Sequence, residues 1–216
     1  TGHSEGEYLG WMSAQEARDG YDLVEWIAEQ PWCDGNVGMV GISYFGTIQL
    51  PVAAQQPPHL KAMMPQAIAA STLDQEMSGV LRLGQSLQWM VVNLATDQIV
   101  RDDEPWGPRT WDEARRLFTE RDRSKWIWFL PLMEIPDHAM HGLGHHWRKW
   151  LGERGKDNFD FLTKLRKIEV PALIVTGWFD QQINALKLFS GMSENGASET
   201  ARNETRIIVG PWGHGT

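Results

Sequence analysis

The stretch Gly41-Ile42-Ser43-Tyr44-Phe45-Gly46 decides the fold, because it places a serine between two glycines where a strand gives way to a helix. Before it, residues 37–40 form a short apolar run with a β-branched residue at each end, as expected for a buried strand. After it, residues 47–56 favour a helix. The two glycines let helix and strand approach closely, and the sharp turn lifts the Ser43 hydroxyl clear of the sheet as a nucleophile. The alternative interpretation is an ordinary glycine-rich turn with a solvent-facing serine.

Composition and charge narrow the class of protein. With 216 residues, 42% of them hydrophobic, the chain is long enough for one domain with a substantial core. A net charge of -8 argues against nucleic acid or an anionic membrane surface as partner, because both require clustered Lys and Arg. No apolar run approaches the roughly 20 residues of a membrane span. The single cysteine, Cys33, excludes an internal disulfide and leaves the redox compartment open.

The two ends of the sequence indicate an excerpt from a longer protein. Residues 1–6 begin without methionine and have the character of a loop, and the sequence stops at Thr216, directly after a glycine-rich segment. We therefore expect any export signal to lie outside these residues, and the sequence does not predict a localisation.

We call the turn at residues 41–46 the elbow. The segment before it predicts an amphipathic helix. Ser13-Ala14-Gln15-Glu16 has the pattern of a capping box, in which the serine caps the first turn and Glu16 reaches back. Apolar residues then recur at helical spacing until Pro31 ends the helix. In the helix after the elbow, Pro51 removes a backbone donor and should kink the chain.

In the rest of the chain, a long segment with helical patterns separates segments that contain strand patterns. Residues 60–68 have the apolar pattern of a strand, whereas residues 73–165 favour helices and hold seven of the 12 tryptophans. Strand, helix and strand patterns return at 170–177, 181–192 and 206–210. Alternating strands and helices imply a mostly parallel sheet, whose carboxyl ends share one edge. We therefore predict an α/β core formed by residues 1–72 and 166–216, with a helical cap inserted at residues 73–165.

Two further side chains follow the ends of predicted strands. Asp180 comes after Gly177-Trp178-Phe179, and His214 comes after Gly210-Pro211-Trp212-Gly213. Ligands bind at this edge in open α/β sheets, and the order Ser43, Asp180, His214 is the one expected of an α/β-hydrolase. Taken singly, Asp180 could be a solvated loop acid and His214 a surface histidine, so the joint placement carries the prediction.

Several segments, in order along nearly the whole chain, resemble one family. They are Pro31-Trp32, residues 34–38 leading into 41–44, residues 57–62, Leu130-Pro131-Leu132, residues 171–180 and residues 210–215. The chain is similar to the α/β-hydrolases grouped with cocaine esterase, X-Pro dipeptidyl peptidases and α-amino-acid ester hydrolases.

The resemblance implies roles for individual residues. Ser43 would be the nucleophile, Asp180 the orienting acid, His214 the base, and the backbone amide of Tyr44 one oxyanion donor. The family's second donor, a tyrosine hydroxyl, would lie in a loop before Thr1, and its C-terminal β-sandwich domain is absent here. No cofactor is implied. The expected partner is a small-molecule ester, an amide or a short peptide, and the oligomeric state is not predicted.

Other polar clusters have simpler interpretations. The insertion contains His138, His141, His145 and His146, but glycines interrupt a helix between them, so we interpret them as loop histidines and predict no metal site. Residues 102–104 could hold a substrate ammonium, although an acidic run before a proline is usually just solvated. The tryptophans could line an aromatic acyl pocket, but packing within the cap explains most of them.

The sequence thus predicts a serine hydrolase of esters or amides, with the helical insertion as a lid over the acyl site. Whether it is an X-Pro dipeptidyl peptidase, an esterase or an acylase stays open. The alternative from another class is a non-catalytic binding module with an α/β-hydrolase fold.

Overall fold

A computed structural model of the protein describes residues 5–10, 12–71, 81–119, 126–153, 160–182 and 184–214. The chain divides into two compact units, which we treat separately. The helical unit comprises Thr1–Trp11 and Glu76–Arg154, and the sheet unit comprises Met12–Gln75 and Gly155–Thr216. Within the described ranges, no helix is both long and apolar enough to cross a membrane.

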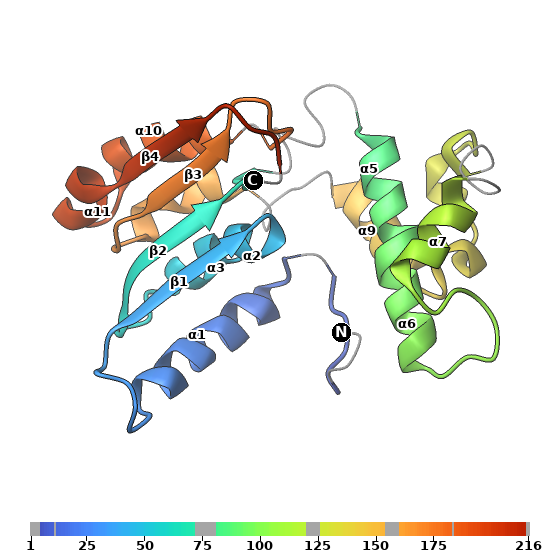
Figure 1. The fold of residues 1–216 in the computed structure, drawn as a ribbon, viewed down its shortest axis with the longest axis horizontal. Coiled ribbons are helices and arrows are strands. Elements are labelled where there is room, and N and C mark those ends of the chain that lie inside the picture. Colours follow the sequence, from blue (N-terminus) through green and yellow to red (C-terminus); the bar gives the residue numbers. More distant parts are fainter. Residues whose placement is uncertain are drawn as a thin grey trace. The chain divides into compact units, whose positions relative to one another are not determined.

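The sheet unit is built on four parallel strands in the order β1-β2-β3-β4 (Figure 1). The strands are β1 (Val37–Ile42), β2 (Leu60–Gln66), β3 (Leu173–Gly177) and β4 (Arg206–Gly210). All three neighbouring pairs are parallel, as predicted. The carboxyl ends of the strands therefore lie along one edge of the sheet, where the loops that follow them can meet.

Helix α1 (Ala14–Ala28) precedes the sheet and confirms the predicted capping box. The Ser13 side chain accepts a hydrogen bond from the Glu16 amide, and the Glu16 carboxylate accepts one from the Ser13 amide. Ala17 and Val24 are buried on the side of the helix that packs on helix α3 and strand β1. The capping box thus fixes the start of a helix that covers the sheet.

The helix after the elbow is divided in two at Ile48, three residues before Pro51. Helix α2 (Tyr44–Thr47) ends before Ile48, and helix α3 (Gln49–Ala53) begins after it. Proline has no amide hydrogen, so position 51 cannot donate to the Thr47 carbonyl four residues earlier. Ile48, between the two helices, keeps α-helical angles (φ -62°, ψ -20°), so the chain shows a break in the hydrogen-bond ladder, and the expected kink stays a prediction.

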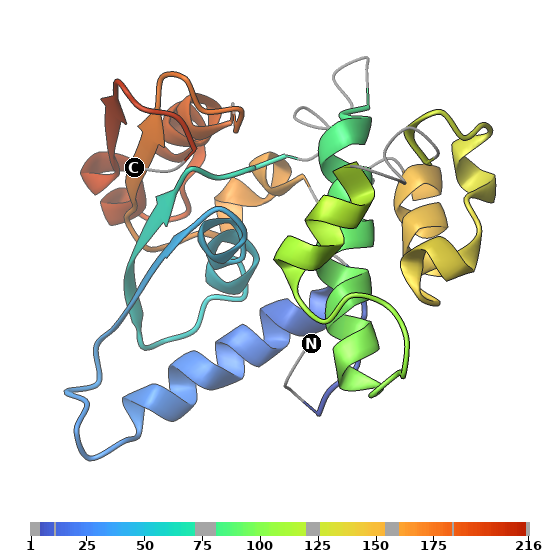
Figure 2. The same cartoon turned by 45° about the vertical axis from the view of Figure 1, so that its right-hand side comes forward.

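The second part of the sheet unit contains η5 (Phe161–Lys167), α10 (Ala185–Asn195) and α11 (Glu199–Glu204). Figures 1 and 2 show α10 and α11 beside strands β3 and β4. The helix expected at 181–192 begins later, at Ala185, because the chain first turns back on Asp180, whose carboxylate accepts from the Gln182 amide. The strand expected from 170 begins at Leu173, after Pro171.

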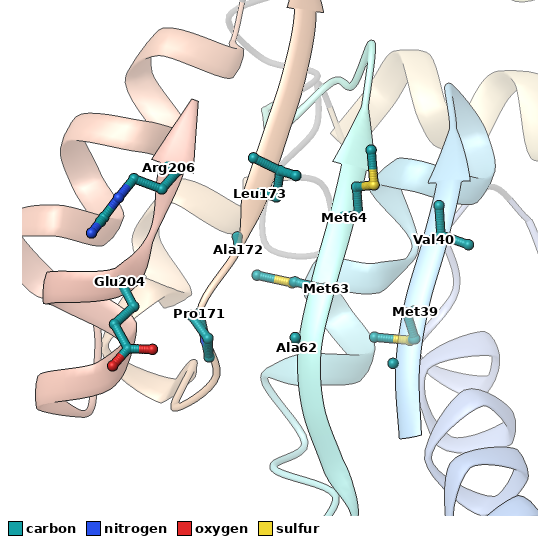
Figure 3. A pocket seen from close by; sticks show the side chains of 11 residues that line it. Met39, Val40, Ala62, Met63, Met64, Pro171, Ala172, Leu173, Glu204 and Arg206 are labelled. Carbon is teal, nitrogen blue, oxygen red and sulfur yellow. The ribbon is translucent and has the colours of Figure 1, made fainter. Parts of the chain in front are cut away.

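One face of the sheet is open. Side chains on this face are exposed, notably Val40 (69%), Leu173 (36%) and Ile208 (47%). A shallow hollow of about 490 Å³ crosses the same sheet, and Figure 3 shows the side chains that line it, among them those of Met39, Met63, Leu173 and Arg206. Parallel sheets in proteins normally have both faces covered, whereas these apolar side chains are exposed in the part of the chain that the structure describes.

Every secondary-structure element that the structure describes in the helical unit is a helix, and loops join these helices. Its elements are α5 (Leu83–Gln88), the π-helix η1 (Trp89–Leu94), α6 (Ala95–Arg101), α7 (Trp111–Leu117), η3 (Leu132–Glu134), η4 (Asp137–Met140) and α9 (Gly144–Glu153). Trp126, Trp147 and Trp150 are buried, whereas Trp106, Trp111 and Trp128 are exposed. The cap was predicted at 73–165, and its role as a lid stays a prediction.

Candidate active site

Ser43 occupies a strained turn at the end of strand β1. Its φ of 59° and ψ of -121° lie outside the regions that a residue with a side chain normally adopts. Hydrogen bonds hold it there: its amide donates to the Gln66 carbonyl at 2.9 Å, and its carbonyl accepts from the Thr47 amide at 2.8 Å. The Thr47 hydroxyl also donates to that carbonyl, at 3.0 Å. The turn is thus fixed from both strand β2 and helix α2.

Gly41 and Gly46 allow this turn, as the sequence predicted. A Cβ atom on Gly41 would lie 2.6 Å from the Phe45 carbonyl oxygen, and one on Gly46 would lie 2.5 Å from Ile68 Cγ2 and 2.7 Å from the Gly41 oxygen. These separations are too short for any side chain. Both glycines are required by the close approach of strand and helix.

The loops after strands β3 and β4 are tied to each other. The amide of Trp178 donates to the Gly210 carbonyl at 2.8 Å, and the amide of Phe179 donates to the Trp212 carbonyl at 3.0 Å. Gly177 lies so close to Trp212 that a Cβ atom there would overlap the Trp212 carbonyl. These contacts fix the loop that carries Asp180 against the loop that carries His214.

Ser43, His214 and Asp180 form a continuous hydrogen-bonded chain. The Ser43 Oγ atom lies 2.9 Å from His214 Nε2, across 171 positions of sequence, and His214 Nδ1 lies 3.0 Å from Asp180 Oδ1. The Asp180 side chain is fully buried, and its Oδ1 also accepts from the Gln182 amide at 2.8 Å. When Nδ1 carries the proton and donates to Asp180, Nε2 is left to accept the serine proton.

Tyr44 is the first residue of helix α2, directly after the serine. Its phenol donates a hydrogen bond to Glu16 Oε1 at 2.7 Å and accepts one from the Met12 amide at 3.2 Å. Burial raises the pKa of the Glu16 carboxyl, while the hydrogen bonds from Tyr44 and Ser13 oppose that rise. The capping-box pattern located Glu16 on its helix, but no pattern in the sequence predicted the contact of Glu16 with Tyr44.

The histidine cluster lies within the helical unit, and the interpretation as loop histidines was wrong for His145 and His146, which lie in helix α9. His141 Nε2 is 3.3 Å from Asp102 Oδ2, and the rings of His145 and His146 are 3.8 Å apart between centroids. Burial and the neighbouring His145 lower the pKa of His146 to about 4. Among the described residues, no three or more His, Cys, Asp or Glu side chains come together as they would around a metal ion.

The acidic run at 102–104 is engaged within the same unit. Both Asp102 carboxylate oxygens accept from Gln98 Nε2 at 2.9 Å, and this bond is the main cause that lowers the pKa of Asp102. Asp103 lies 3.8 Å from Arg109, whose guanidinium donates to the Glu104 carbonyl. A role of this run in holding an ammonium group stays a prediction.

Comparison with known proteins identifies the family. All 216 residues match the X-Pro dipeptidyl-peptidase (S15) family. The chain belongs to this family. The family predicted from the sequence is therefore confirmed. Relatives of this S15-family chain include the cocaine esterase of Rhodococcus sp. (strain MB1 Bresler), which is 28% identical over 224 residues, covering 98% of the chain and 36% of the esterase.

Solved structures confirm the α/β-hydrolase fold of the S15-family chain. A CocE/NonD family hydrolase from Staphylococcus aureus superposes with a TM-score of 0.56 at 24% identity, covering 96% of this chain and 30% of the hydrolase. An α/β fold family hydrolase from Bacillus anthracis str. Sterne gives a TM-score of 0.53 at 16% identity, covering 99% and 73%. The chain spans about a third of the length of the cocaine esterase and of the Staphylococcus aureus hydrolase.

Proposed function

We propose that this chain carries the catalytic groups of a serine hydrolase that cleaves ester or amide bonds. One observation carries the proposal: Ser43 Oγ, His214 and Asp180 are joined by hydrogen bonds of 2.9 and 3.0 Å. They sit on loops that follow the carboxyl ends of β1, β3 and β4, the edge at which ligands bind in open α/β sheets. Membership of a family whose named relatives include an esterase supports the same proposal.

The chemistry follows from the residue types. A serine hydroxyl is a weak nucleophile until a neighbouring base removes its proton. His214 Nε2 is placed to take that proton as Oγ attacks the substrate carbonyl, and Asp180 holds the imidazole in the required tautomer and stabilises the imidazolium. The imidazolium then protonates the leaving alcohol or amine, which departs and leaves an acyl group on Ser43. Water, activated by the same imidazole, hydrolyses that acyl-enzyme.

The oxyanion formed in each step requires hydrogen-bond donors. We assign the backbone amide of Tyr44 as one donor, because Tyr44 opens helix α2 immediately after the nucleophile. An oxyanion donor of this kind is typically worth about 10²–10³ in rate.

The substrate stays at the level of a class. Relatives of this chain include a cocaine esterase and a Xaa-Pro dipeptidyl-peptidase from Lactobacillus delbrueckii subsp. lactis. We therefore propose a small ester, an amide or a short peptide as the substrate. A prolyl-dipeptide chromogenic substrate, assayed beside a simple aryl ester, separates a peptidase from an esterase.

The test of the proposal is the Ser43→Ala variant of the whole protein, assayed with p-nitrophenyl esters. Removal of the nucleophile should lower turnover by at least about 10³-fold, because triad members act as a unit. A matched control is Ser190→Ala, which changes an exposed serine on helix α10 and should retain full activity. Turnover by Ser43→Ala equal to that of the parent would overturn the proposal, and an absence of turnover in the parent as well would favour a non-catalytic binding module.

A further inference from the structure

Glu16 links the start of helix α1 to the residue that follows the nucleophile. One carboxylate oxygen, Oε2, accepts from the Ser13 amide at 2.8 Å and completes the capping box. The other, Oε1, accepts from the Tyr44 phenol at 2.7 Å, although the two residues are 28 positions apart. A helix cap needs only the first of these bonds. The second bond therefore has a purpose outside the helix.

The Tyr44 phenol is held from two sides. It donates to Glu16 and accepts from the amide of Met12, which lies just before the helix cap. A tyrosine hydroxyl offers one donor and accepts through its lone pairs, so these two bonds fix the direction of the O–H group.

The backbone of Tyr44 requires such support. It follows Ser43, whose φ of 59° is strained, and strain of this kind persists only where the surrounding structure holds it. The bonds from Gln66 and Thr47 fix the backbone of Ser43 itself. The phenol bond fixes the opposite end of the next residue. Tyr44 is thereby anchored at its side chain as well as along its backbone.

We propose that Glu16 is a positioning residue for the oxyanion site: it holds the Tyr44 phenol so that the Tyr44 amide keeps its direction beside Ser43. The inference rests on the proposed serine-hydrolase function and adds one residue to it. Glu16 touches neither substrate nor reacting atoms and acts only through Tyr44. The described charged or polar groups that face it are the Tyr44 phenol, the Ser13 amide, and Asp19 one turn along its own helix.

A displaced oxyanion donor weakens the binding of the transition state more than that of the substrate. Replacing Glu16 by Gln, or Tyr44 by Phe, should therefore lower kcat about tenfold with KM changed less than twofold. The affinity for a trifluoromethyl ketone, which forms a tetrahedral adduct with an active serine, should fall by a similar factor. Tyr44→Phe removes only the phenol oxygen, so it tests the contact even if Glu16→Gln folds poorly.

The matched control is Ser13→Ala, which removes the serine side chain of the same capping box and leaves the Glu16–Tyr44 bond in place. It should lower the melting temperature but keep kcat within about twofold of the parent. The kcat of the double variant Glu16→Gln/Tyr44→Phe should lie within about twofold of the kcat of the slower single variant, because both changes break the same bond.

The outcomes separate this inference from the proposed function. If Ser43→Ala abolishes turnover while Glu16→Gln and Tyr44→Phe resemble Ser13→Ala, the positioning role is wrong and the nucleophile stands. If KM rises and kcat is unchanged, the pair affects substrate binding and the positioning role is again wrong. If Ser43→Ala retains full turnover, the proposed function fails, and the inference fails with it.

Discussion

Ser43 shows how a single residue combines strain and function. Its positive φ costs on the order of 1–3 kcal/mol for a residue with a side chain. The strained turn directs Oγ toward His214 Nε2, which lies 2.9 Å away. A serine in a relaxed turn at the same place would not present its hydroxyl beyond the end of strand β1.

Gly46→Ala tests the close approach that this turn requires. The new Cβ would lie 2.5 Å from Ile68 Cγ2 and 2.9 Å from the Gln66 oxygen, so the core must shift. We expect the variant to lose about 1–3 kcal/mol of unfolding free energy in urea titrations, the usual cost of overpacking. Gly38→Ala, in the preceding strand β1, is the control, because its Cβ would meet nothing nearer than 3.8 Å. Equal stabilities of the two variants would contradict this account.

His146 predicts a pH dependence. Burial and the neighbouring His145 lower its pKa from 6.5 to about 4, so the folded state holds the ring neutral where an unfolded chain would protonate it. The stability from the neutral ring is fully present above pH 6.5 and is lost as the pH falls toward 4. An NMR titration of the His146 ring should have its midpoint near 4, and His145→Gln should raise that midpoint. A midpoint at 6.5 would refute the prediction.

At the scale of elements, local signals predicted most boundaries. The capping box fixed the start of helix α1, and the strand at 206–210 has the predicted bounds. Predictions were less accurate where a tertiary contact overrides a local pattern. Helix α10 starts four residues later than expected because the Gln182 amide donates to the carboxylate of Asp180 in the active-site loop.

Packing inside the helical unit depends on Trp147. This side chain is 1% exposed, and its indole N–H donates to the Leu132 carbonyl at 2.9 Å. Trp147→Phe leaves a cavity and removes the indole hydrogen bond to the Leu132 carbonyl, which together should cost about 2–4 kcal/mol of unfolding free energy. Trp128 is 79% exposed, so Trp128→Phe should change stability by less than about 0.5 kcal/mol. Chemical denaturation followed by circular dichroism compares the two, and similar losses would argue against a packing role.

At the scale of the molecule, a parallel sheet brings distant residues to one edge. The rule that strand carboxyl ends share an edge was enough to predict that Ser43, Asp180 and His214 lie near each other. It could not predict the hydrogen-bond lengths or the contact of Glu16 with Tyr44. Those features depend on side-chain packing between segments far apart in the sequence, which periodicity does not encode.

The most direct test of the central claim is covalent labelling of the whole protein with a fluorophosphonate, followed by peptide mass spectrometry. Attack by Ser43 on phosphorus would expel fluoride and leave the phosphonyl group on its oxygen. We predict one modified peptide containing Ser43, no modification of that peptide in Ser43→Ala, and labelling slowed at least about 10³-fold in His214→Ala. An unmodified Ser43, or equally fast labelling without His214, would contradict the account.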